Sequence, residues 1–169
     1  NPIFFKKFIT VLFGLGALVS KIYSFLDCSS WSSTFSESLF NETDLLVVNE
    51  IELETLSKKK LPDTKIDSIR TSVDLIPLAK HQSIVVTLGA EGVYVRDQHK
   101  DEYIQGHKVH SLDTTGSGDC FIGAMASYLL HKRDLFDASV FANKAASISV
   151  TRKGASSSMP TKDEVVNLS

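Results

Sequence analysis

The stretch SLDTTGSGDCFIGAMASYLL, residues 111–130, joins a glycine-rich turn to a long apolar run. Gly116 and Gly118 allow backbone conformations and close approaches that residues with a Cβ resist. The apolar run predicts a buried helix, whose first N–H groups have no acceptor within the helix. With the helix dipole, these groups make an anion site. Asp119 lies at the junction, and because Asp is also a good N-cap, an anion site and a simple cap are both open.

The glycine-rich turn matches neither of two common phosphate-binding motifs. GxxxxGK[ST] is absent, and so is GxGxxG. A carboxylate within an anion site is electrostatically unfavourable unless it has a task of its own. In phosphoryl transfer, backbone amides hold the charge of the transferred group while a carboxylate accepts the proton of the nucleophile. That chemistry explains why an anion site and a base would meet at the start of one helix.

Size and composition predict one soluble domain with a sizeable core. The chain has 169 residues, 43% of them hydrophobic, and a formal net charge of −2. No dense basic stripe with interleaved aromatic residues is present, so we expect no nucleic-acid partner. The basic run Lys58–Lys60 is typical of a solvated helix end. Cys28 and Cys120 have no metal-ligand spacing; Cys120 is either a reactive thiol at a helix N-terminus or, as we prefer, a small packed residue.

The first forty residues differ from the rest of the chain. A basic start and an apolar run from Phe8 to Val19 resemble a signal peptide or a poor membrane span, which Lys21 interrupts. We expect a cytoplasmic protein, with a nuclear location as an alternative; membrane attachment through residues 8–26 is disfavoured but stays open. The Ser-rich stretch CSSWSSTFSES, which begins at Cys28, predicts a connector.

From residue 41 onward, apolar runs alternate with helical patterns. Strands are expected at DLLVV, SIVVTLG, the hairpin GVYVRD and DEYIQG, and HKVHSL; helices at NEIELETLSKK, DTKIDSIRTSVDLIPLAKH, residues 115–131, residues 134–149 and TKDEVVNL. Pro77 should end the second helix, and Thr161 with Glu164 has capping-box spacing. This alternation predicts an α/β fold with a mainly parallel sheet.

Four ordered segments resemble the ribokinase-like (PfkB-type) carbohydrate kinases. They are VVNEIELETL, VVTLGAEGVYV, DTTGSGDCFIGA and FANKAASISVTRKGASSSMPTKDEV, and they run from about residue 41 to 166. The VTRKGA and SMP elements of the last segment, and the stretch DLLVVNEIE, resemble ribokinase more than fructokinases or adenosine kinases. The resemblance implies part of a three-layer α/β/α, Rossmann-like fold over residues 41–169, preceded by an atypical segment, residues 1–40, without a family match.

The resemblance also implies roles for individual residues. Asp119 would be the catalytic base, and the amides of Gly116, Ser117 and Gly118 would form the anion hole. ATP and hydrated Mg²⁺ would contact Asn49, Glu52, Thr87, Gly89, Ala90, Glu91, Gly92, Val93, Tyr94, Gly118 and Asn143. A monovalent cation, K⁺, would be ringed by Asp113, Thr115, Ser149, Arg152, Gly154 and Ser158. Helix capping by Asn49 and Glu52, a plain glycine turn at residues 89–92 and a solvent-facing amide at Asn143 are the structural alternatives.

The expected activity is ATP-dependent phosphorylation of a sugar hydroxyl, with ribose giving ribose 5-phosphate. The alternatives are a non-catalytic nucleotide-binding fragment or pseudoenzyme without a sugar-binding half, another sugar or nucleoside kinase of the family, and a membrane-attached module. The family's Gly-Gly sugar motif and lid have no counterpart in this sequence. An exposed sheet edge would favour self-association, for example as a homodimer.

Overall fold

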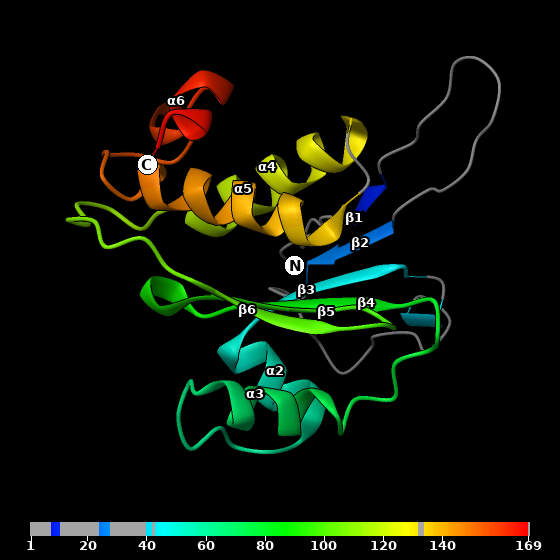
Figure 1. The fold of residues 1–169 in the computed structure, drawn as a ribbon. Helices are drawn as coiled ribbons and strands as arrows, with labels where there is room; N and C mark the ends of the chain where they lie inside the picture. The colour runs from blue at the N-terminus through cyan, green and yellow to red at the C-terminus, as the bar shows by residue number, and fades with distance from the viewer. Residues whose placement is uncertain (1–7, 11–23, 28–39, 42, 132–133, 169) are drawn as a thin grey trace, which may run out of the picture. The chain divides into compact units, whose positions relative to one another are not determined.

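The computed structural model describes residues 8–10, 24–27, 40–41, 43–131 and 134–168 (Figure 1). The chain divides into two compact units. Unit 1 comprises residues 1–87 and 96–101, and unit 2 comprises residues 88–95 and 102–169. Each unit holds part of the predicted site.

The described strands of unit 1 form a mixed sheet. Strands β3 (Leu45–Asn49) and β4 (Ser83–Thr87) pair in parallel, with Asn49 opposite Thr87. Strand β2 (Ser24–Asp27) pairs in parallel with β3, and β1 (Phe8–Thr10) pairs antiparallel with β2. The apolar runs of β3 and β4 are buried without a break, from Leu45 to Val48 and from Ile84 to Val86. Such runs are typical of parallel strands covered on both faces.

Two helices connect β3 to β4. Helix α2 (Glu50–Ser57) packs against both strands, and α3 (Ile66–Val73) packs against α2; both helices lie on one side of these strands (Figure 1). Lys58 ends α2 in the left-handed conformation, with φ of 54°. Residues 58–60 are exposed, which confirms the expected solvated helix end. Helix α3 ends four residues before Pro77, as a proline at that place requires.

Unit 2 contains a β-hairpin and a group of helices. The hairpin pairs β5 (Gly92–Arg96) with β6 (Asp101–Gln105), and only its tip, residues 96–101, is assigned to unit 1. Helices α4 (Ser117–His131) and α5 (Leu135–Ser149) pack along each other, and α6 (Lys162–Val166) packs on α5 (Figure 1). Short 3₁₀ turns are η2 (Gly89–Glu91) and η3 (Ser156–Ser158). Thr161 and Glu164 form the predicted capping box at the start of α6.

One predicted strand is wrong. Residues 107–112, HKVHSL, are all described and form no strand. The N–H groups of Leu112 and Asp113 both donate to the Val150 carbonyl, at 2.7 and 3.2 Å. This stretch is mainly exposed, its end bonds to the end of α5, and it pairs with no strand in the part of the chain that the structure describes.

No helix within the described ranges is both long and apolar enough to cross a bilayer. The apolar stretch considered as an anchor contributes strands β1 and β2 at its two ends. Its middle, residues 11–23, lies outside the described residues, as does most of the Ser-rich connector with Cys28.

Candidate functional site

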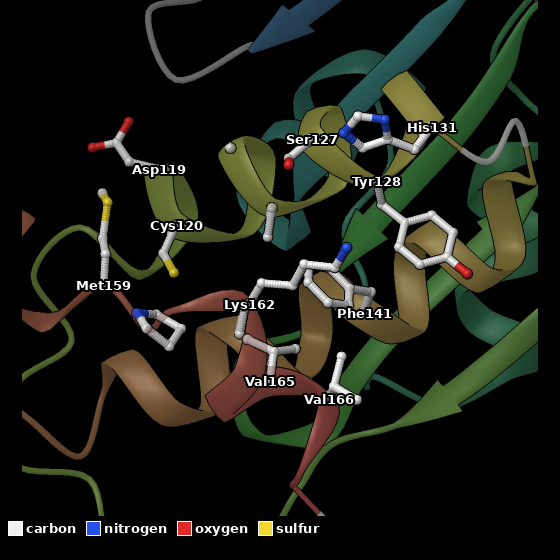
Figure 2. Close-up of a pocket in the computed structure, with 14 residues that line it drawn as sticks. Asp119, Cys120, Ser127, Tyr128, His131, Phe141, Met159, Lys162, Val165 and Val166 are labelled. Carbon is white, nitrogen blue, oxygen red and sulfur yellow. The ribbon is translucent and has the colours of Figure 1, made fainter.

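The glycine-rich turn leads directly into α4. Gly116 has φ of +77°, in the left-handed region that favours glycine. Ser117 N–H donates to Thr114 O at 3.2 Å, and Cys120 N–H donates to Gly116 O at 2.9 Å. Between them, Gly118 is exposed and its N–H has no acceptor among the described residues. Asp119 lies in the same first turn of α4, and its exposed carboxylate points outward (Figure 2).

Asp113 connects this turn to the loop after α5. Its Oδ1 accepts the Thr115 N–H at 3.0 Å, and its Oδ2 accepts the Gly154 N–H at 2.9 Å. Hydrogen bonds from Thr115 and from the Gly154 backbone lower the pKa of Asp113 to about 2, because they stabilise the charged form. The carboxylate therefore stays ionised at neutral pH and joins two loops that are 41 residues apart.

The two loops also touch at their smallest residues. A Cβ placed on Gly116 would lie 3.0 Å from the Ala155 Cβ and 3.2 Å from its Cα. Gly154 has φ of +90°, so the second loop also turns through a glycine conformation. Together with the Asp113 bonds, this contact fixes the backbone from which the anion turn starts.

The residues predicted to ring a monovalent cation lie mostly in this loop pair. Ser149 and Ser158 are buried, and their hydroxyls donate to the carbonyls of Ala146 and Ala155. The Asp113 carboxylate, which is ionised at neutral pH, and oxygen ligands from the backbone would suit a hard cation. Within the described ranges, no group of three His, Cys, Asp or Glu side chains is placed to hold a metal ion. His107 and His110 belong to no such group.

Arg152 has a side-chain contact that the sequence did not indicate. Its Nη2 lies 2.5 Å from Oε1 of Glu164 on α6. The other oxygen of Glu164 accepts the Thr161 N–H at 2.7 Å and completes the capping box. The pKa of Glu164 is lowered to about 2, chiefly by the hydrogen bond from the Arg152 guanidinium and further by the hydrogen bonds from Thr161. Loop 150–158 is therefore tied to α6 by a charged pair.

In unit 1, the predicted Mg²⁺ and nucleotide residues lie at the carboxyl ends of neighbouring parallel strands. Asn49 ends β3 and faces Thr87, the last residue of β4. Ligands of open α/β sheets bind at such ends. Asn49 and Glu52 also form a complete capping box: Glu52 N–H donates to Asn49 Oδ1 at 3.0 Å, and Asn49 N–H donates to Glu52 Oε2 at 2.8 Å. The capping alternative is thus present, and it holds the Glu52 carboxylate in a fixed orientation beside the strand end.

The predicted nucleotide edge of unit 2 is a tight turn before the hairpin. Gly89, Ala90 and Glu91 form η2 and are exposed, and Gly89 has φ of +53°. The side chains of Val93 and Tyr94 are fully buried, so they form the wall behind this turn rather than its surface. Tyr103 Oη donates to the Glu91 carbonyl at 2.5 Å and fastens the turn to β6.

Asn143 is buried rather than solvent-facing. It is 5% exposed, and its Nδ2 donates to Gln105 O at 3.0 Å, which joins α5 to the end of β6. The solvent-facing alternative is therefore wrong. The next residue, Lys144, donates from Nζ to the Leu168 carbonyl at 2.5 Å and holds the end of the chain after α6.

A cavity of about 530 Å³ opens along α4 beside Asp119 (Figure 2). Its lining is largely apolar and includes Tyr128, Phe141 and Val165, while Lys162 supplies a cation. Cys120 lines the cavity but packs with Ala145 and Val165, and burial raises the pKa of its thiol. The packed-residue interpretation of Cys120 is thus supported, since a buried thiol with a raised pKa is unreactive.

Comparisons with known proteins show the family and the fold of this chain. The model of the "pfkB family carbohydrate kinase" matches residues 19–162. This chain belongs to the pfkB carbohydrate kinase family. The matched part begins within the first forty residues, and the division at residue 40 stays a prediction. Ribokinase of Staphylococcus aureus (strain COL) is 37% identical over 128 residues, which are 75% of this chain and 41% of that protein.

Other pfkB relatives differ in the sugar that they are named for. Fructokinase-1 of Zea mays is 36% identical over 141 residues, 78% of this chain and 41% of that protein. The structure of Arabidopsis thaliana ribokinase complexed with ribose and ATP superposes with a TM-score of 0.74 at 29% identity, covering 85% of this chain and 46% of that one. These matches confirm the ribokinase-like α/β fold. The chain spans less than half the length of the relatives it matches.

The predicted site residues of this pfkB chain form two groups, one in each compact unit. Within unit 2, Asp113, Thr115, Gly116 and Gly154 come together beside Asp119; within unit 1, Asn49, Glu52 and Thr87 come together. The sequence did not point to Ala155, Glu164 or Lys162. A small residue directly after Gly154 was the one available signal for the close loop contact.

Proposed function

We propose that this chain supplies the phosphoryl-transfer part of an ATP-dependent sugar kinase, with ribose as the acceptor and ribose 5-phosphate as the product. The observation that carries the proposal is the exposed Asp119 in the first turn of α4, behind a glycine turn clamped by Asp113. The ribokinase names among the relatives support ribose, and pfkB membership supports sugar phosphorylation.

In the proposed reaction, the ribose 5-hydroxyl oxygen attacks the γ-phosphorus of ATP. A new O–P bond forms as the bond from the γ-phosphorus to the β,γ-bridging oxygen breaks, and its electron pair leaves with ADP. Asp119 accepts the hydroxyl proton. Of the predicted anion hole, the Gly116 and Gly118 amides hold the charge on the transferred group, because the Ser117 N–H donates to the Thr114 carbonyl within the turn. Mg²⁺ would neutralise the phosphate oxygens near Asn49 and Glu52, and K⁺ would lie near Asp113.

The test is Asp119→Asn in the complete protein, assayed with ATP, Mg²⁺, K⁺ and ribose. Loss of a general base costs about 10²–10⁴ in rate, so we expect kcat to fall by that factor while ATP affinity changes by less than about threefold. Asp137→Asn on α5 is the control, because it also removes one exposed carboxylate of unit 2. Turnover of the Asp119 variant within a few-fold of wild type would reject the assignment.

A further inference from the structure

We propose that the Arg152–Glu164 ion pair is a positioning device for the anion turn. It would hold loop 150–158 against α6, and this loop in turn holds the backbone that presents Asp119. The inference rests on the proposed function, because it assigns these two side chains a role in the same phosphoryl transfer. Neither side chain touches the reacting atoms in this proposal, so both are positioning residues.

The capping box at the start of α6 orients the Glu164 carboxylate independently of Arg152. Glu164 Oε2 accepts the Thr161 N–H at 2.7 Å within the capping box, which leaves Oε1 for Arg152 Nη2 at 2.5 Å. Most surface ion pairs contribute little because two flexible side chains must be ordered together. Here one partner is already fixed by its own helix end, so the pair sets the position of Arg152 and its loop.

Helix α6 has anchors that are independent of this pair. Val165 is 2% exposed and packs with Cys120 of α4 and Ala145 of α5. Beyond the helix, the Leu168 carbonyl accepts the Lys144 Nζ. Glu164 therefore projects from a helix that is packed on α4 and α5, and the ion pair transfers this fixed position to the neighbouring loop.

A short series of contacts leads from Arg152 to the turn. Gly154, two residues after Arg152, donates its N–H to Asp113 Oδ2 at 2.9 Å. Asp113 accepts the Thr115 N–H through its other oxygen, and Ala155 lies against Gly116. Gly116 precedes Asp119 by three residues. A shift of the 152–155 backbone would consequently move both the anion hole and the base.

Three changes separate the charge pair from the helix cap. Glu164→Gln keeps an N3 side chain that serves a capping box but removes the charge that faces Arg152. Arg152→Met removes the cation, and the double exchange of Arg152→Glu with Glu164→Arg restores opposite charges. Asp163→Asn is the matched control: it removes one negative charge from the same helix turn, and Asp163 makes no ion pair within the described residues.

The first measurement is hydrogen–deuterium exchange of the Gly154 and Thr115 amides in the 169-residue chain. We expect exchange to become about two- to fivefold faster in Glu164→Gln and Arg152→Met, the range of an exposed ion pair. Asp163→Asn and the double exchange should stay near wild type. Urea midpoints should be unchanged in all variants, which separates a local effect from unfolding. Unchanged exchange in both single variants would overturn the proposal.

The second measurement is turnover in the complete protein. We expect the two single variants to lower kcat and to raise the K⁺ concentration for half-maximal rate, with the KM for ATP unchanged and with recovery in the double exchange. Faster amide exchange with wild-type kcat and K⁺ response would show a purely structural pair and would overturn the positioning role. A wild-type protein without turnover would instead reject the proposed function itself, and the positioning role with it.

Discussion

At the scale of single residues, Gly92 shows how one absent Cβ shapes the predicted nucleotide edge. Its φ is +119°, and a Cβ there would lie 2.1 Å from the Ile104 carbonyl oxygen and 2.5 Å from the Gly106 nitrogen. Leu88 N–H donates to the Gly92 carbonyl at 2.8 Å and closes the turn. The exposed 3₁₀ turn, residues 89–91, therefore depends on a position where L-residues with a side chain do not fit.

We expect Gly92→Ala to lower the free energy of unfolding by at least about 1–3 kcal/mol, because it adds both backbone strain and a clash with β6. The matched control is Gly123→Ala on α4, where a Cβ would meet no atom within 4 Å. An alanine within a helix should stabilise by about 0.5–1 kcal/mol. Urea unfolding followed by circular dichroism measures both changes; equal effects at the two positions would contradict this account.

At the scale of elements, the loops before α4 and after α5 act as one structural element. Asp113 joins them through two backbone N–H groups, and its pKa is lowered to about 2 from an ordinary value of 3.8. A depressed pKa means that this contribution to stability is complete above about pH 4. The contribution is lost as the pH falls through about 2, because protonation removes the charge that accepts both bonds.

Asp113→Asn should therefore be less stable than wild type at pH 7. An Asn side chain has one carbonyl oxygen, so it accepts one N–H and presents an amide to the other. The difference in unfolding free energy should stay constant from pH 7 to about 5 and shrink toward zero near pH 2. Parallel urea titrations across this range, with Asp163→Asn as the charge control, measure it. A difference that grew on acidification would contradict the assigned sign.

How far the sequence predicts this structure depends on how local each signal is. The apolar runs of β3 and β4 and the capping boxes at Asn49 and Thr161 are encoded within a few residues, and the structure confirms them. Residues 107–112 lack such a local signal: their apolar residues, Val109 and Leu112, are three positions apart, which is not the period of a strand, and the segment pairs with no strand among the described residues. Contacts between distant loops, such as Gly116 with Ala155, depend on tertiary packing and leave almost no local pattern.

The burial of Asn143 could have been inferred from the spacing of residues along α5. One face of α5 is buried at every third or fourth residue, at Phe136, Ser139, Asn143 and Ser147. Small and polar members make this buried face hard to separate from a surface face. The Arg152–Glu164 pair had no comparable signal, because the two side chains are twelve positions apart in the sequence and lie on a loop and on a helix.

At the scale of the whole molecule, membership of the pfkB family rests on a match that covers most of this chain, but the sugar is not decided by that match. Ribokinase of S. aureus and fructokinase-1 of maize are 37% and 36% identical to this chain, respectively. Near-equal identities to relatives named for different sugars leave the acceptor of this chain undecided. Selectivity must therefore be measured on the complete protein.

We expect the complete protein to use ribose with kcat/KM at least about tenfold above fructose and 2-deoxyribose. A site that hydrogen-bonds a hydroxyl discriminates strongly against an analogue without it, and 2-deoxyribose lacks one such group. Competition assays with two sugars in one reaction, quantified by mass spectrometry of the phosphorylated products, measure this ratio directly. Asp119→Asn should lower all rates together and leave the ratios unchanged. A preference for fructose would redirect the substrate proposal while leaving the phosphotransfer chemistry in place.

The contact of Gly116 with Ala155 has a practical consequence for protein engineering. A Cβ added at Gly116 would lie 3.0 Å from the Ala155 methyl carbon, so Gly116 cannot be enlarged without moving the second loop. A designer who transplants the glycine-rich turn into another scaffold must therefore transplant the second loop as well. The unit to transfer is the pair of segments 113–119 and 150–158. A graft of the glycine-rich turn alone would keep its sequence but lose its backbone conformation.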